Sequence, residues 1–193
     1  MSAPHLVLDA VACLRGGRLL FEGMNLAVGP GAALIVEGPN GAGKTSLLRI
    51  AAGLLRPAAG RVTRPDRLGF LGHELGLDLD RTVAGALGLW ARIDGADDAR
   101  VARAMAAMRL EALAAVPVRM LSSGQRRRAG LARVIASGAP LWLLDEPGVG
   151  LDAASLEALA TAIESHRATG GAVMATSHMP LGIAAPDRLA MGA

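Results

Sequence analysis

A glycine-rich segment near residue 40 constrains the fold of this 193-residue chain more than any other feature. An apolar run at 32–36, typical of a strand buried on both faces, leads into it. A stretch with helical character follows at 44–55, and Gly53 and Pro57 mark its end. A strand, a glycine loop and a helix start predict a phosphate cradle, because glycines let backbone amides converge and the helix adds partial positive charge. The loop fits the pattern G-x-x-x-x-G-K-[ST] and comprises Gly38, Pro39, Asn40, Gly41, Ala42, Gly43, Lys44 and Thr45.

The last two residues of this loop carry the chemistry expected of a nucleotide-phosphate site. Lys44 is the only lysine among 20 basic residues, so this one place uses a compact ammonium where the rest of the chain uses arginine. In such loops the lysine reaches the β- and γ-phosphates, and the hydroxyl that follows it, here Thr45, ligates Mg²⁺. A chain with one lysine cannot also contain the N-K-x-D motif of a GTPase, which argues against that class.

A second indication comes about 100 residues downstream, where an apolar run at 141–144 ends in two acids, Asp145 and Glu146. At the carboxyl end of a strand, Asp145 can hold Mg²⁺ through water and Glu146 can polarise the water that attacks a γ-phosphate. A strand that ends in acids is common and often marks only an exposed strand end. Together with the phosphate loop, the pair predicts hydrolysis of a nucleoside triphosphate.

A polar segment, Leu121–Gln125, precedes a stretch of helical character at 126–136. Taken alone it is a helix cap, because a serine at a helix start satisfies unpaired backbone amides. The amides of Ser122 and Gly124 could equally grip a phosphate, and Gln125, the only glutamine of the chain, lies beside them. Since the glycine loop already binds one nucleotide, this second phosphate-binding segment could bind the nucleotide of another copy of the chain. A P-loop kinase has no use for such a segment.

The order of apolar and polar stretches predicts one α/β domain with a mostly parallel sheet and antiparallel strands at its N-terminal side. We expect a core formed by residues 1–74 and 126–193, and a small helical lobe inserted at about 75–125. The expected strands lie at 24–28, 32–36, 141–144 and 173–176, and the expected helices at 44–55, 82–109 with a break at 94–95, 126–136 and 152–168.

Composition excludes several other classes. Apolar residues make up 52% and charged residues 19% of the chain, which excludes a disordered protein. Nucleic-acid binding is not expected, because the net charge is only +3, aromatic residues are 2% and Tyr is absent. Cys13 is the only cysteine, so no intrachain disulfide or cysteine metal site is expected. The sequence has no apolar run of about 20 residues and no apolar leader, so a cytoplasmic location is expected.

The phosphate loop, the LSSGQ segment, the LLDEP segment, a Leu151–Asp152 pair and a strand-end His178 resemble, in this order, an ATP-binding-cassette ATPase domain. The motifs cover nearly the whole chain and are specific as a set. The resemblance implies that ATP and Mg²⁺ are bound between two identical copies, because each copy has one phosphate loop and one LSSGQ segment.

The same resemblance implies a role for each matching residue. The residues 38–45 would bind ATP and Mg²⁺, with Lys44 also acting in catalysis. Asp145 would be an acid in the second sphere of the metal, Glu146 the catalytic base, and His178 a switch contacting the γ-phosphate and Glu146. The segment containing Ser122, Gly124 and Gln125 would contact the ATP of the partner, and Asp152 would lie in the loop that connects the two protomers.

Two positions depart from the family pattern. The family usually places a glutamine at the strand end that leads into the helical lobe, whereas this chain has His73 there, with Glu74 next to it. A neutral imidazole can still contact Mg²⁺ or the attacking water, and whether His73 or Glu74 takes this role is left open. The family also often stacks adenine on an upstream aromatic residue. Arg15 falls at that place and could stack its guanidinium on the base, or be an exposed hairpin residue.

Within the family, the chain resembles the ATP-binding subunits of haem exporters in bacterial cytochrome c maturation. The features that carry this likeness are His73, Thr82–Ala84, the signature segment with its arginines, and Ala175–Leu181. It implies separate membrane permease subunits and a peripheral place on the cytoplasmic face of the inner membrane. Direct haem binding is not expected, because His5 and Cys13 match no axial-ligand pattern. The alternatives are a soluble assembly-scaffold ATPase and the ATPase of an exporter with another substrate.

Overall fold

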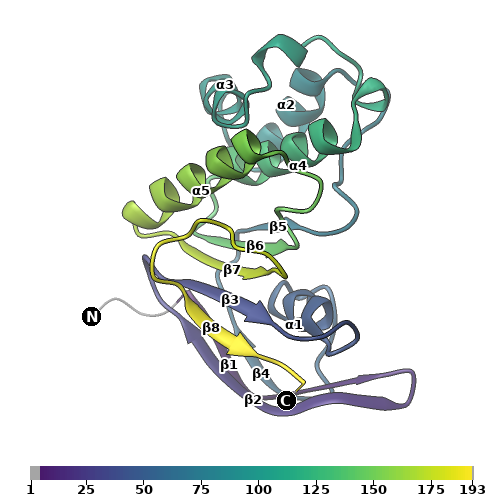
Figure 1. Cartoon of the computed structure of the whole chain (residues 1–193), viewed down its shortest axis with the longest axis vertical. Coiled ribbons are helices and arrows are strands. Elements are labelled where there is room, and N and C mark those ends of the chain that lie inside the picture. Colours follow the sequence, from purple (N-terminus) through teal and green to yellow (C-terminus); the bar gives the residue numbers. More distant parts are fainter. Residues whose placement is uncertain (1–4, 193) are drawn as a thin grey trace.

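Two β-sheets and two groups of helices build the protein, whose computed structural model describes residues 5–192 (Figure 1). The smaller sheet is antiparallel, with the order β2-β1-β4. Its position at the N-terminal side of the chain agrees with the expectation from the sequence. Its strands are β1 (Leu6–Arg15), β2 (Arg18–Val28) and β4 (Ala59–Thr63).

The larger sheet has five strands in the order β5-β6-β7-β3-β8, and every neighbouring pair is parallel. All residues of β6 and β7 are buried, as their unbroken apolar sequences require of strands covered on both faces. Because the strands are parallel, their carboxyl ends lie along one edge of the sheet, and the loops that follow them meet there. The strands are β3 (Ala33–Glu37), β5 (Leu68–Leu71), β6 (Leu141–Asp145), β7 (Ala172–Thr176) and β8 (Asp187–Ala190).

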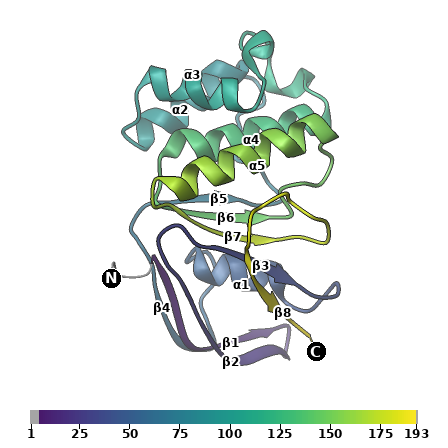
Figure 2. The ribbon, with the colours of Figure 1, turned by 60° about the vertical axis from the view of Figure 1, so that its left-hand side comes forward.

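Helices cover both faces of the larger sheet. Helix α1 (Lys44–Ala51) lies between the two sheets and packs on β1, β6 and β7. Helices α4 (Ser123–Ser137) and α5 (Ala153–Ala168) cover the opposite face (Figure 2). The sheet therefore separates two apolar cores, one around α1 and one around α4 and α5.

An outer helical layer packs on α4, away from the sheet (Figures 1 and 2). It consists of α2 (Val83–Ile93) and α3 (Asp98–Ala107), followed by the short 3₁₀ turns η1 (Glu111–Leu113) and η2 (Val118–Met120). All of it comes from the chain between β5 and α4. None of the helices between residues 5 and 192 is long and apolar enough to cross a bilayer.

Two helix boundaries differ from the sequence-based expectation by about three residues or more. Helix α1 ends at Ala51 instead of continuing to 55, because Gly53 adopts a left-handed φ of 73° and its N–H donates to the carbonyl of Ile50. Helix α4 begins at Ser123 instead of 126, because Ser122 caps it. The polar segment before α4 is thus partly helical itself.

Candidate active site

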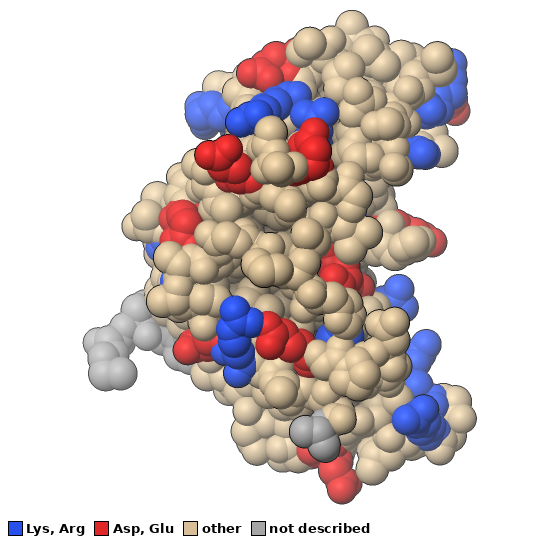
Figure 3. All heavy atoms as spheres, viewed as in Figure 1, with Lys and Arg blue, Asp and Glu red and all other residues tan. Residues whose placement is uncertain are grey.

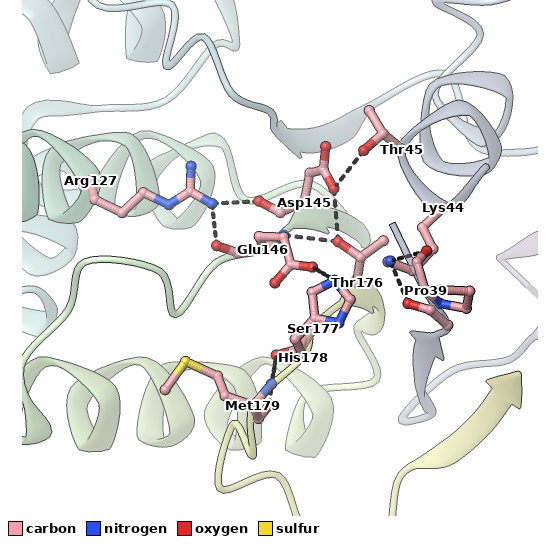
Figure 4. Close-up of polar contacts among 11 residues, drawn as sticks. Pro39, Lys44, Thr45, Arg127, Asp145, Glu146, Thr176, Ser177, His178 and Met179 are labelled. Atoms are coloured by element: carbon pink, nitrogen blue, oxygen red, sulfur yellow. Dashed lines mark hydrogen bonds and ion pairs between the residues drawn. The ribbon is translucent and has the colours of Figure 1, made fainter. Parts of the chain in front are cut away.

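Four loops meet at the carboxyl edge of the parallel sheet, and each carries residues singled out from the sequence. Figure 4 shows those that follow β3, β6 and β7. The glycine loop follows β3, and His73 comes two residues after the end of β5. Asp145 ends β6, and His178 comes two residues after the end of β7. Residues up to 140 positions apart in the sequence are brought together because parallel strands present their ends on one side.

The glycine loop adopts backbone conformations that side chains rarely allow. Gly38, Gly41 and Gly43 have φ values of 143°, 83° and 99°. A Cβ on Gly38 would lie 2.3 Å from the carbonyl oxygen of Met191, so Met191 packs directly against this glycine. A Cβ on Gly43 would lie 3.2 Å from the ring of Phe21. The loop therefore presents bare backbone amides at the N-terminus of α1, an arrangement suited to an anion.

Lys44 folds back over the loop from the first turn of α1. Its side chain is buried, with 8% exposure, and its Nζ donates to the carbonyl oxygens of Gly38 at 2.7 Å and Pro39 at 3.1 Å. The ammonium is thus held over a cavity of about 290 Å³. The cavity is lined by Leu20, Asn40, Gly41, Gly43, Lys44, Thr45, Ser46, Glu146 and His178.

Asp145 is joined to the loop and to the neighbouring strand by two hydroxyl groups. Thr45 Oγ1 donates to Asp145 Oδ1 at 3.2 Å, and Thr176 Oγ1 donates to the same oxygen at 2.7 Å. Asp145 is 9% exposed. A hydroxyl and a carboxylate within contact of each other form an oxygen donor set that suits Mg²⁺. Between residues 5 and 192 no three His, Cys, Asp or Glu side chains cluster, so such an ion would also need water and phosphate oxygens as ligands.

Glu146 follows Asp145 in a strained conformation that turns its side chain toward His178. Its φ is 48°, which is unusual for a glutamate, and its N–H donates to Thr176 Oγ1 at 2.9 Å. Its Oε1 lies 3.3 Å from His178 Nε2. The carboxylate of Glu146 is 26% exposed and the imidazole of His178 is 49% exposed. A carboxylate placed at the mouth of the phosphate cavity and oriented by an imidazole has the geometry of a general base.

The segment before α4 forms a reciprocal capping box. Ser122 Oγ accepts from the N–H of Gln125 at 3.2 Å, and Gln125 Oε1 accepts from the N–H of Ser122 at 2.9 Å. A Cβ on Gly124 would lie 2.7 Å from the carbonyl oxygen of Gly150, so this glycine is required by close packing. In the described part of the chain, these residues do not line the cavity at the glycine loop. Within one chain the segment is therefore a helix cap that lies apart from the cavity at the glycine loop.

His73 lies in a different cavity from the glycine loop. It lines a space of about 740 Å³ together with Ser123, Arg127 and Glu146. It also borders, with Glu74, a smaller space of about 340 Å³. The structure thus brings His73 to the same cavity as Glu146, but gives it no hydrogen bond to Thr45 or Asp145 among the residues described. The choice between His73 and Glu74 stays open.

Two further residues singled out from the sequence lie away from the phosphate cavity. Arg15 ends β1 and pairs with Arg18 at the tip of the β1–β2 hairpin, and the cavity is bordered by Leu20 instead. Its stacking role stays a prediction. Asp152 caps α5, where its Oδ1 accepts from the N–H of Ser155 at 2.8 Å. The hydrogen bonds with Ser155 are the main reason why the pKa of Asp152 is lowered.

Sequence reasoning missed two residues that hold the site together. Thr176 ends β7 and bonds both the carboxylate of Asp145 and the N–H of Glu146 (Figure 4). Arg127 donates to the carbonyl oxygens of Gly72, Asp145 and Glu146. The position of Thr176 at a strand end was a usable signal. Arg127 gave none, because nothing in the sequence distinguishes it from its two neighbours in the run Arg126–Arg128.

Charges are mixed over the face of the molecule shown in Figure 3. Basic and acidic side chains lie interspersed there, without an extended patch of one sign. This face therefore lacks the extended basic patch that is typical of nucleic-acid binding.

Comparison with known proteins agrees with this geometry. Residues 21–149 match the family described as "ABC transporter". The "Cytochrome c biogenesis ATP-binding export protein CcmA" of Sphingopyxis alaskensis is 57% identical over 187 residues, covering 97% of this chain and 96% of that protein. The protein of the same name from Zymomonas mobilis is 49% identical, covering 93% of this chain and 81% of that protein.

Solved structures share the fold at lower sequence identity. The ATP-binding subunit of an ABC transporter superposes with a TM-score of 0.82 at 21% identity, covering 90% of this chain and 79% of that one. The ATP-binding cassette MJ0796, in a dimeric post-hydrolysis state bound to ADP and Pi, superposes with a TM-score of 0.80 at 23% identity. That comparison covers 90% of this chain and 88% of the other.

Proposed function

The chain belongs to the ABC transporter family, and within it to the cytochrome c biogenesis ATP-binding export proteins, and on this premise we propose how it works. It is an ATP-hydrolysing subunit, and two copies close around two ATP molecules to drive separate membrane permease subunits. The observation that carries the proposal is the placement of the Glu146–His178 pair at the mouth of the cavity that the glycine loop and Lys44 form.

ATP binding follows from the loop. The amides of residues 38–45 and the N-terminus of α1 supply partial positive charge for the phosphates. Lys44, now bonded to loop carbonyls, exchanges these for β- and γ-phosphate oxygens, which are stronger acceptors because they are charged. Thr45 and Asp145 would hold Mg²⁺, which when bound would neutralise charge on the phosphates.

Hydrolysis follows from Glu146. The carboxylate accepts a proton from a water molecule as the water oxygen forms a bond to the γ-phosphorus, and the bond from this phosphorus to the β-phosphate oxygen breaks to leave ADP. His178 orients the carboxylate and donates to the γ-phosphate. The strained backbone of Glu146 fixes the side chain in this direction before the nucleotide arrives.

Each ATP site is formed by residues of two copies of the chain. Each site takes the glycine loop from one copy and the segment Ser122–Gln125 from the other. In this proposal residues 1–74 and 126–193 form the core, and residues from about 75 to 125 form a helical lobe that carries this segment toward the partner. Asp152, at the start of α5, would lie near the junction of the two copies.

The transported substrate and the permease are inferred from the family. The names of the relatives place them in export and in cytochrome c biogenesis, and haem is the substrate that we propose for this chain. The subunit would then bind peripherally at the cytoplasmic face of the inner membrane. Recovery from detergent-solubilised membranes together with polytopic subunits supports transport, whereas a complex without them favours an assembly scaffold.

The catalytic assignment is tested by a matched pair of variants. Glu146→Gln should abolish ATP turnover while ATP still binds, because the amide cannot accept the proton. Glu157→Gln, an equivalent change on the exposed face of α5, should leave turnover unchanged. Chelating Mg²⁺ should stop turnover by the unmodified protein. Turnover by Glu146→Gln at the rate of the unmodified protein would refute the assignment of the base.

A further inference from the structure

Arg127 lies on α4, about one turn after Ser123, and contacts the ends of two strands of the parallel sheet. Its guanidinium donates to the carbonyl oxygen of Gly72 at 3.0 Å. It also donates to the carbonyl oxygens of Glu146, at 2.5 Å, and of Asp145, as Figure 4 shows. Gly72 immediately follows β5, and Asp145 ends β6. One side chain thus joins a helix to the two strand ends that carry His73 and the acids.

Arg127 is one of three groups that bond the strained backbone of Glu146. The N–H of Glu146 donates to Thr176 Oγ1 on one side, and its carbonyl accepts from Arg127 and from the N–H of Val149, at 3.2 Å, on the other. A φ of 48° in a glutamate persists only where the surroundings enforce it. Arg127 therefore helps to fix the conformation that points the carboxylate toward His178.

The environment of Arg127 is costly for a charged group. Its Nε is buried and has no hydrogen-bond partner among residues 5–192, and its other nitrogens donate to neutral carbonyls. Burial lowers the pKa of the guanidinium, although the charges of Asp145 and Glu146 counteract this. A charge kept in such a place without an ion pair indicates a requirement for its rigid, multiply donating geometry.

We propose that Arg127 is a positioning residue for ATP hydrolysis, which holds the backbone of Glu146 and of Gly72 in place relative to α4. The inference rests on the proposed function, because it assigns Glu146 as the base. Since α4 starts at the segment that would contact the ATP of the partner, the same side chain ties that contact to the hydrolytic centre of its own chain.

The proposal predicts a split between turnover and binding. Arg127→Ala should lower kcat by roughly 10²-fold, as expected when a catalytic group is misplaced by about 1 Å. The affinity for ATP, measured with a fluorescent analogue, should change by less than about threefold, because Arg127 does not line the phosphate cavity. Arg127→Lys should recover only part of the rate, since an ammonium cannot span the three carbonyls.

Arg133 offers a matched control on the same helix. It is also partly buried, donates to the carbonyl oxygen of Phe70 at 2.5 Å and lies over the ring of Trp90 at 4.8 Å, but it contacts no strand-end acid. Arg133→Ala should lower stability without a comparable loss of kcat in the folded fraction. Added guanidinium ion, at concentrations that leave the fold intact, should partly restore turnover by Arg127→Ala and not affect Arg133→Ala.

These measurements distinguish a failure of the positioning role of Arg127 from a failure of the proposed function. If the unmodified protein fails to hydrolyse ATP, or Glu146→Gln hydrolyses it normally, the function itself is wrong. If those results hold but Arg127→Ala keeps the normal kcat, or loses ATP affinity as much as kcat, the positioning role is overturned. An equal loss of kcat in Arg133→Ala, or no rescue by guanidinium, also overturns it.

Discussion

At the scale of single residues, Lys44 shows how one side chain can be specified by geometry instead of charge. Its ammonium fits between two loop carbonyls, and arginine, used at all other basic positions, has a larger planar head group. Lys44→Arg should therefore weaken ATP binding by about tenfold or more although the charge is kept. Titration with a fluorescent ATP analogue measures this, and the reverse change at the exposed Arg49→Lys is the control. Equal affinity in the Lys44→Arg protein would contradict the assignment.

Two glycines of the same loop should respond differently to a methyl group. Gly38→Ala places a Cβ against the carbonyl of Met191 and also requires a φ of 143°, so we expect destabilisation by at least about 2 kcal/mol. A Cβ on Gly41 would meet no described atom within 4 Å, so Gly41→Ala is strained only by the backbone φ of 83°. We expect this strain to lower the free energy of unfolding by about 1 kcal/mol. Urea unfolding of the two variants compares these values. Equal losses would show that the contact with Met191 does not matter.

At the scale of elements, two substitutions of Ser122, at the start of α4, can distinguish its role as a helix cap from its proposed contact with the partner's ATP. Ser122→Ala removes the cap and should cost about 1 kcal/mol of stability. Ser122→Asp keeps a capping oxygen, so stability should stay within about 0.5 kcal/mol, but it sets a negative charge against the phosphate of the partner's ATP. Its ATPase rate should therefore fall at least tenfold, roughly 1.4 kcal/mol in barrier height. An Asp variant with the normal rate would mean that the segment is only a cap.

The contact between α5 and β6 should make stability depend on pH. The ring of His166 stacks on Trp142, with centroids 3.9 Å apart and planes 5° apart, and burial lowers its pKa to about 4 from 6.5. The folded state therefore favours the neutral ring. The resulting stability is complete above pH 6.5 and is lost as the pH falls from 6.5 to about 4, by at most about 3 kcal/mol.

His166→Phe provides the comparison, because phenylalanine keeps a stacked ring that cannot be protonated. Urea unfolding at several pH values between 7.5 and 4 should show a steeper fall for the unmodified protein than for this variant. Parallel curves would mean that the imidazole does not titrate in this range.

Some of this architecture could be predicted from the sequence because it is encoded locally. The glycine loop, the apolar strands and the acids after β6 each lie within one short stretch, and parallel strands place such stretches at one edge. The contacts of Arg127 could not be predicted, because its acceptors lie 18, 19 and 55 residues away in the sequence. They are backbone carbonyls, which every residue has, so no residue type indicates them. The contact of Met191 with Gly38 depends on β8, which pairs with β3 from the far end of the chain.

At the scale of the whole molecule, none of the residues Ser122–Gln125 lines the cavity at the glycine loop, and Ser123 lines a different cavity of the described chain. In the proposed function, one complete site therefore requires two copies, with each copy supplying half. This is the central claim, because ATP hydrolysis, the role of α4 and the coupling through Arg127 all depend on it.

Mixing two inactive variants tests this claim most directly. Lys44→Ala removes the ammonium that binds phosphate and Ser122→Asp disrupts the contact with the partner's ATP, so each alone should keep at most about a tenth of the normal turnover. After subunit exchange, half of the dimers should contain both, and each of these holds one site with no altered residue, so turnover should recover to about a quarter of normal. Measured ATPase activity near that level supports the account. A mixture whose turnover stays at the level of its components, or either variant alone turning over ATP as fast as the mixture, would contradict it.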